Sequence, residues 1–241
     1  MTRRSKTIIT DITSIMPDAA ALYRLMTWLS PAYPLGAFSY SHGIEYAVEI
    51  GLIHDAESLA GWLETVLCAG TGCSDAALFA WAYRAAAAEN DAGLDDIADL
   101  ASAWRGSSET ALESEAQGTA FLATTLAAWP HRALAAFARR RKSAALPVAV
   151  AVACAAHRVP LTAALGAYLQ TFAANLVSAG IRLVPLGQTD GQRVIARLEQ
   201  PIAATAAAAL AMPLDAVGTS APIVDWCSMR HETQYTRLFR S

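Results

Sequence analysis

Residues 55–68 read DAESLAGWLETVLC and carry the clearest helical pattern in the chain. Asp55 suits the position before a helix, because its carboxylate accepts a hydrogen bond from a free N–H of the first turn. The apolar residues that follow recur at intervals of three and four, which places them on one face of an α-helix. They are Leu59, Trp62, Leu63, Val66 and Leu67. The stretch predicts an amphipathic helix that buries one face against other helices.

The same spacing recurs on both sides of this helix. Asp18 is expected to cap a helix that stops at Ser30, and residues 108–128 and 161–180 predict two long helices. The apolar face of the first is expected to comprise Leu22, Leu25, Met26 and Leu29. The chain has no alternating run of strand length and no internal repeat, so the sequence predicts an all-α, single-domain bundle of roughly ten helices.

Glycines and small polar residues are expected to mark where these helices begin and end. Gly70 and Gly72 would close the helix after residue 55, with Ser74 or Asp75 opening the next. Gly180 would end the long helix that begins at residue 161. Thr189 has capping-box spacing to Gln192. The sequence thus predicts a flexible arm at residues 1–17, briefly strand-like at 7–10, a helical domain at 18–227 and a separate C-terminal segment at 228–241. The chain that follows Met212 and Pro213 is expected to be polar and irregular.

Composition limits the function classes. Apolar residues make up 54% and charged residues 16% of the 241, and the formal net charge is −3. An acidic chain has no general attraction for nucleic acid. The longest uncharged apolar run, residues 144–156, falls short of the ~20 residues needed to cross a membrane. Four cysteines without a CxxC pair, and no signal peptide, fit a reducing cytoplasm. The low charge fits either an Ala-rich helical protein or one whose apolar surface is covered by partner subunits.

Residues 30–45, SPAYPLGAFSYSHGIE, form the one long irregular stretch between helical patterns. Pro31 and Pro34 stiffen the backbone, and the neighbouring aromatic residues supply rigid apolar bulk. Phe38 is expected to be buried. Tyr40, Ser41 and Glu45 are candidates either to cap the following helix or to face a partner. The serines lack the flanking glycines of a nucleophile elbow, so the loop is interpreted as a shaped surface.

Other catalytic patterns are incomplete. The two lysines, Lys6 and Lys142, lack the glycines of a phosphate-binding loop. Residues 231–235, HETQY, begin like a zinc-binding HExxH helix but lack its second histidine. Glu113 and Glu115 lie in a helical run and are expected on a solvated face. No catalytic residue, metal ligand or cofactor is therefore predicted, and the composition favours a binding or scaffold protein.

Three stretches carry a family resemblance. Residues 30–45, residues 182–192 (RLVPLGQTDGQ) and residues 229–239 (MRHETQYTRLF) occur in this order. Together they resemble the signatures of the UreF family of urease accessory proteins, over about residues 20–241. His42 stands where glutamine is common in that family, and Ile44 where leucine is.

The resemblance implies an all-α homodimer without catalytic activity of its own. It implies that the chain bridges a UreD-like (also called UreH-like) protein and the GTPase UreG on apo-urease for nickel delivery. The alternative is a GTPase-activating or fidelity regulator of UreG, using an arginine such as Arg182 or Arg230. The segment 228–241 is expected to order on the UreD-like partner, the alternative being that it packs on its own domain. Arg182, Gln188, Asp190 and Gln192 are expected on the dimer or GTPase-facing surface, the alternative for Gln188 and Asp190 being that they only cap helices. The predicted partner-binding residues are Tyr40, Ser41, Glu45, Arg182, Gln188, Asp190, Gln192, Arg230, His231, Tyr235, Arg237, Leu238 and Phe239.

Overall fold

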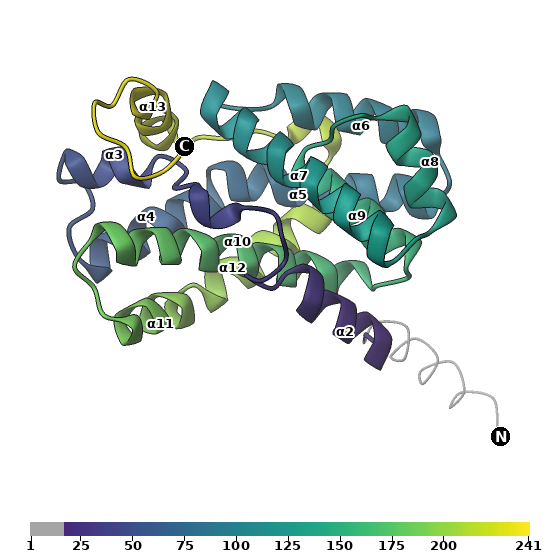
Figure 1. Cartoon of the computed structure of the whole chain (residues 1–241), viewed down its shortest axis with the longest axis horizontal. Helices are drawn as coiled ribbons and strands as arrows, with labels where there is room; N and C mark the ends of the chain where they lie inside the picture. The colour runs from purple at the N-terminus through teal and green to yellow at the C-terminus, as the bar shows by residue number, and fades with distance from the viewer. Residues whose placement is uncertain (1–16) are drawn as a thin grey trace.

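The computed structural model describes residues 17–241, which form one all-α domain. These residues contain twelve α-helices, two short 3-10 turns and no strand, which confirms the predicted fold class (Figure 1). The expected strand-like stretch at 7–10 and almost all of the expected arm lie outside the described residues. In chain order the elements are α2 (Ala19–Trp28), η1 (Ala37–Ser39), α3 (Ile44–Glu49), α4 (Ala56–Cys68), α5 (Thr71–Ala87), α6 (Asp91–Ala103), α7 (Ser108–Ala128), α8 (Arg132–Arg140), α9 (Leu146–Ala156), α10 (Leu161–Leu183), α11 (Gln188–Arg197), α12 (Glu199–Ala211), η2 (Leu214–Ala216) and α13 (Pro222–His231).

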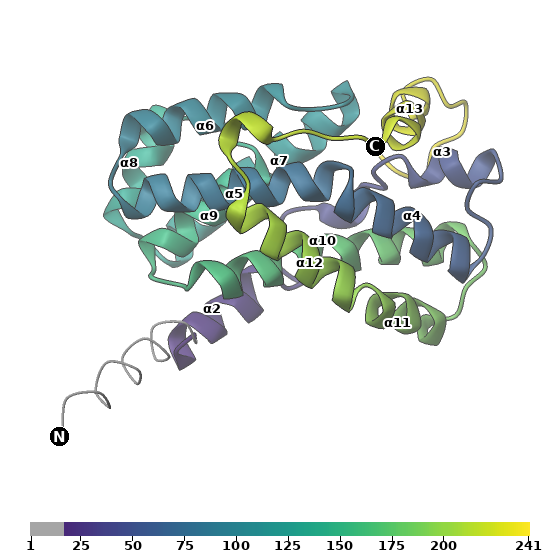
Figure 2. The ribbon, with the colours of Figure 1, turned by 180° about the vertical axis from the view of Figure 1, so that it is seen from behind.

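Helix α5 runs through the centre of the bundle, with α4, α6, α9, α10 and α12 packed around it (Figure 2). Half of its ten buried residues are alanines, and Leu78 and Phe79 are among the others. Helix α9 is buried from residue 147 to residue 154. A helix that is apolar on all sides belongs in the core, and alanine allows close approach of the neighbouring backbone. The alanine excess of the sequence therefore builds the centre of this fold.

Polar residues begin several helices as expected. The carboxylate of Asp18 accepts from the backbone N–H of Ala21 at 2.7 Å, and Asp55 accepts from Ser58 at 2.8 Å. Ser107 closes a capping box with Thr110 at the start of α7, the helix predicted for residues 108–128. Each cap satisfies an N–H group that has no partner inside its helix. The five apolar residues of the stripe in α4 are all buried, as predicted.

Two of the glycines that were expected to end helices lie inside helices. Helix α5 begins at Thr71, so Gly72, Ser74 and Asp75 lie inside it instead of closing or opening a helix. Helix α10 continues past Gly180 to Leu183. A Cβ atom at Gly180 would lie 2.6 Å from Leu59 Cδ2, so this glycine makes room for the side chain of α4. The prediction of a helix end at Gly180 is wrong because the residue serves close packing.

Two further boundaries differ from the prediction. Gly187, not Thr189, is the residue before α11, and the carboxylate of Asp190 accepts from its N–H at 3.3 Å. Helix α13 occupies a region predicted to be irregular. Its inward-facing residues include Ser228 and His231, so its buried face is partly polar and lacks an apolar repeat.

The apolar face of α2 is narrower than predicted. Leu25 and Trp28 are buried, whereas Leu22 is 49% and Met26 70% exposed. Helix α2 lies at the edge of the bundle, away from α3 and α13 (Figure 1). Helices α3 and α13 meet at the opposite end, where they pack on each other and on α10 and α7 respectively. This end of the bundle gathers the candidate site residues.

Candidate partner-docking site

The loop between α2 and α3, residues 29–43, crosses from one helix layer to another. Tyr33 and Tyr40 are buried, and the hydroxyl groups of Tyr33 and Thr125 share a hydrogen bond of 2.8 Å. Burial raises the pKa of the Tyr33 hydroxyl. Phe38, in contrast, is 71% exposed on the short turn η1, so the prediction that it is buried is wrong. The loop is anchored by its two tyrosines and presents its phenylalanine to solvent.

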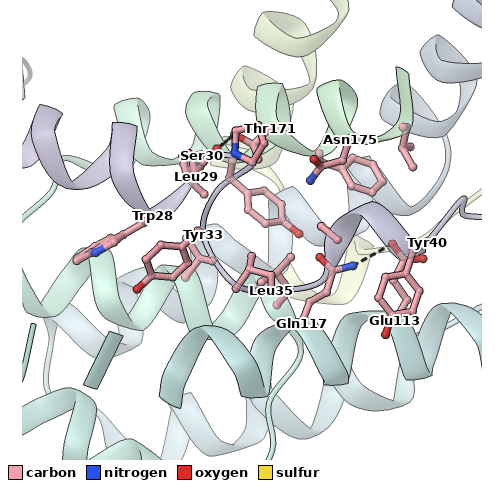
Figure 3. A pocket seen from close by; sticks show the side chains of 17 residues that line it. Trp28, Leu29, Ser30, Tyr33, Leu35, Tyr40, Glu113, Gln117, Thr171 and Asn175 are labelled. Atoms are coloured by element: carbon pink, nitrogen blue, oxygen red, sulfur yellow. Dashed lines mark hydrogen bonds between the residues drawn. The ribbon is translucent and has the colours of Figure 1, made fainter. Parts of the chain in front are cut away.

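A small cavity lies beneath this loop, between α7 and α10 (Figure 3). Its volume is about 40 Å³. Gln117 and Glu113 line it from α7, and Thr171 and Asn175 line it from α10. Binding sites for small molecules usually enclose ~300–1,000 Å³. The cavity has room for ordered water rather than for a cofactor.

The end of the loop turns sharply into α3. His42 and Gly43 both have positive φ values, 56° and 79°. A Cβ atom at Gly43 would lie 2.9 Å from the backbone nitrogen of Ser228, so glycine allows α13 to approach here. Ser41 is fully buried, and its hydroxyl accepts from the N–H of Glu45 at 3.4 Å. Ser41 therefore supplies an acceptor to the first turn of α3, from two residues before its N-cap, Gly43.

An acid–histidine cluster, formed by Glu45, Glu109, Glu113, His42 and His231, lies behind this turn. His231 has no exposed surface. Its Nδ1 lies 2.6 Å from Glu109 Oε2, and its Nε2 lies 3.0 Å from Glu45 Oε2. Two carboxylates on the two ring nitrogens require two N–H donors, or a proton on one carboxyl group. His231 therefore joins the two buried carboxylates through its two ring nitrogens.

Glu113 forms the second half of the cluster. His42 Nδ1 lies 3.2 Å from Glu113 Oε2, and the amide of Gln117 donates to Glu113 Oε1 at 3.3 Å. His42 Nε2 contacts the Thr71 hydroxyl at 3.1 Å. The prediction of a solvated face is wrong for Glu113, which is buried, whereas Glu115 is exposed. The imidazole of His42 thus supplies a partner for a buried carboxylate.

Residues 232–241, which we name the tail, close over the cluster. The carboxylate of Glu45 accepts from the N–H groups of Leu238 and Phe239, at 2.6 Å and 2.9 Å. Arg237 donates to Glu109 Oε1 at 2.9 Å. The tail therefore packs on its own domain, which is the alternative to ordering on a partner.

Arg182, the first residue of the stretch 182–192, packs against the other side of the tail. Its guanidinium carbon lies 4.4 Å from the centre of the Phe239 ring, and its Nη2 donates to the Phe38 carbonyl at 2.9 Å. Burial lowers the pKa of the Arg182 guanidinium. Segments near residues 40, 182 and 239 thus meet at one site. Gln188, Asp190 and Gln192 lie outside it, at the start of α11, where Asp190 also pairs with Arg193 at 2.7 Å.

Comparison of the sequence with known proteins shows which family this chain belongs to. The model of the UreF family matches residues 53–199, which is more than half of the chain. The chain belongs to the UreF family. It is 55% identical over 223 residues to the urease accessory protein UreF of Granulibacter bethesdensis, covering 92% of this chain and 94% of that protein. The urease accessory proteins UreF of Bradyrhizobium diazoefficiens and of Rhodopseudomonas palustris strain BisA53 are each 53% identical, covering 93% and 92% of this chain and 93% and 94% of theirs.

This UreF-family chain presents apolar side chains outside the buried cluster. Tyr235 is fully exposed and Leu238 is 66% exposed. Helix α13 adds three exposed apolar residues that the sequence analysis missed, because it predicted no helix there. They are Ile223, Trp226 and Met229. We name these five residues the α13–tail surface.

The other predicted residues divide between burial and exposure. Tyr40 and Glu45 are buried in this chain, so they support the surface from beneath. Arg230 is exposed, and its guanidinium carbon lies 5.9 Å from the centre of the Tyr46 ring. Tyr46 in turn meets Trp226 edge to face at 5.5 Å. Arg230 therefore borders the α13–tail surface.

Within residues 17–241, no group of three or more His, Cys, Asp or Glu side chains is placed to hold a metal ion. The carboxylates and imidazoles of the acid–histidine cluster are instead bonded to one another and to the tail. None of the described helices is both long and apolar enough to cross a membrane.

Cys227 offers a chemical test of how α13 is docked. It is fully buried, and burial raises the pKa of its thiol to about 11, whereas Cys68 is exposed. Since the thiolate is the reactive form, we expect iodoacetamide at pH 8 to alkylate Cys227 about a hundredfold more slowly than Cys68. Peptide mapping by mass spectrometry over time measures both rates. Equal rates would contradict the docked position of α13.

Proposed function

We propose that this chain acts in urease maturation as an accessory protein without a catalytic step of its own. Membership of the UreF family and the printed names of its relatives support this role. More specifically, a homodimer would bridge a UreD-like (UreH-like) protein and the GTPase UreG, so that nickel reaches apo-urease. These partners follow from the sequence resemblance.

The α13–tail surface is the observation that carries the docking part of this proposal. Five large apolar side chains at one end of the bundle are exposed: Ile223, Trp226, Met229, Tyr235 and Leu238. Clusters of exposed apolar residues are typical of protein–protein interfaces, and tryptophan and tyrosine commonly contribute most of the binding energy. Arg230 lies at the border of this surface, and arginine is also enriched at protein–protein interfaces. We assign this surface to the UreD-like partner.

Co-purification with the UreD-like protein tests this assignment. Trp226 and Trp104 are matched probes, because they are 42% and 41% exposed and Trp104 lies in the connection between α6 and α7, outside the five residues of the α13–tail surface. Loss of a central interface tryptophan commonly costs 2 kcal/mol or more, so Trp226→Ala is expected to weaken the complex by about thirtyfold. Trp104→Ala is expected to bind as the unaltered chain does.

The same experiment includes the GTPase, with and without GTP, to separate the two partners. Trp226→Ala should retain its helical circular dichroism while losing the UreD-like protein. Equal binding by the two tryptophan variants would refute the assignment of this surface. Failure of the unaltered chain to bind either partner would refute the bridging role itself.

A further inference from the structure

The tail lies in a groove that the rest of the chain builds. Glu45 at the start of α3 and Glu109 on α7 form its acidic floor. Residues 39–41 of the α2–α3 loop form one edge, and Arg182 of α10 forms the cover. All of these groups come from elements other than the tail, so the tail contributes only the occupant.

The groove binds the occupant's backbone. One buried carboxylate, that of Glu45, receives two consecutive N–H groups, from residues 238 and 239. The N–H of Arg240 donates to the carbonyl of Ser39 at 2.8 Å, and the N–H of Ser41 donates to the carbonyl of Ser241 at 2.7 Å. Backbone hydrogen bonds of this kind hold extended peptides without regard to sequence.

Two side chains add sequence preference. Phe239 is 4% exposed and lies beneath the guanidinium group of Arg182, a favourable cation–π arrangement. Arg237 pairs with Glu109, whose carboxylate is largely buried. Leu238 between them points to solvent. The groove is therefore complementary to an extended Arg-x-Phe segment, in which the middle residue is free to vary.

The link between α13 and the anchored residues is only lightly held. Tyr235 is fully exposed. The backbone N–H groups of Thr233 and Gln234 bond only to the last turn of α13. The Ser108 hydroxyl donates to the carboxylate of Glu232, and the amide of Gln234 donates to the carboxylate of Glu49; both bonds are exposed, where such contacts contribute little. The anchored residues can thus leave the groove without unfolding the helix that holds His231.

We propose that this groove is a docking site for an extended Arg-x-Phe segment of another protein, and that the tail occupies it until such a segment displaces it. Charge complementarity favours this occupant, because Glu45 and Glu109 face the segment's N–H groups and its arginine. The covalently attached tail has a high effective concentration, so it excludes weak competitors. The proposal concerns the groove beneath the tail; displacement of the tail would move Tyr235 and Leu238 but leave Ile223, Trp226 and Met229 on α13.

A labelled peptide of residues 234–241, QYTRLFRS, tests the groove on the full chain. Phe239→Ala weakens the attached tail, so this variant is expected to bind the peptide at least about tenfold more tightly than the unaltered chain does. The control peptide QYTRLARS lacks the phenylalanine and should not bind. Adding Arg182→Ala or Glu45→Gln to Phe239→Ala should remove the gain. Arg182 is exposed, which makes its variant the safer one for folding.

Fluorescence anisotropy gives the affinities, and circular dichroism verifies that each variant is folded. Equal affinity of Phe239→Ala and the unaltered chain for QYTRLFRS would overturn the proposal, as would equal binding of the two peptides. Concentration-dependent dimers that Phe239→Ala abolishes would also overturn it, since the occupant would then be the tail of a second copy. None of these outcomes bears on co-purification through Trp226.

Discussion

Replacing His231 with alanine is expected to lower the free energy of unfolding by about 3–5 kcal/mol. The imidazole lies between the carboxylates of Glu45 and Glu109 and has no exposed surface. Without it, two buried acids keep their charges with fewer partners, or one must bind a proton. Urea denaturation followed by circular dichroism measures the loss. The same variant should also speed alkylation of Cys227, because the last turn of α13 loses its anchor.

His54 supplies the control for this experiment. It lies 3.6 Å from the Asp55 carboxylate, but their side chains are 67% and 54% exposed. Exposed ion pairs contribute about 0–1 kcal/mol, so His54→Ala should change stability little. A loss below 1 kcal/mol in His231→Ala would show that the carboxylates are satisfied by other means, and would contradict the role assigned to His231.

The sequence predicts most of the helices for a physical reason. Helix α4 carries both an apolar repeat and a polar cap, and α7 begins with a polar capping box; the predicted starts of both helices are confirmed. Helix α13 fails this test because the side it buries includes Ser228 and His231, which find partners only once α3 and α7 are in place. A helix whose partners are polar groups on distant elements has no local apolar repeat.

The candidate site was predictable in part. The stretches around residues 40, 182 and 239 were singled out, and the structure brings these three together. The buried acids beneath these stretches were not singled out, because the local sequence around a carboxylate in a helical run is the same whether that carboxylate is buried or solvated. One signal was present: Glu109, Glu113 and Gln117 recur every four residues on a single face of α7. Such a polar stripe on a long helix is a reason to expect a buried network.

Replacing Gly118 with alanine is expected to destabilise the fold by about 3 kcal/mol, although alanine is the better helix former. A Cβ atom at residue 118 would lie 2.0 Å from the carbonyl oxygen of Ala144 and 2.8 Å from the backbone nitrogen of Leu146. These are backbone atoms at the start of α9, so they cannot rotate aside. Helix α7 would have to move, and Glu109 and Glu113 would move with it.

Gly166 provides the matched control for Gly118. It lies inside α10, and a Cβ atom there would meet no heavy atom within 4 Å. Gly166→Ala should therefore raise stability by about 0.4–1 kcal/mol, through the usual gain of alanine over glycine in a helix. Opposite signs for the two substitutions, measured as shifts of the urea midpoint, would confirm that the close backbone contact between α7 and the start of α9 decides the effect at Gly118. A stabilising effect at both positions would instead mean that α7 tolerates displacement at this contact.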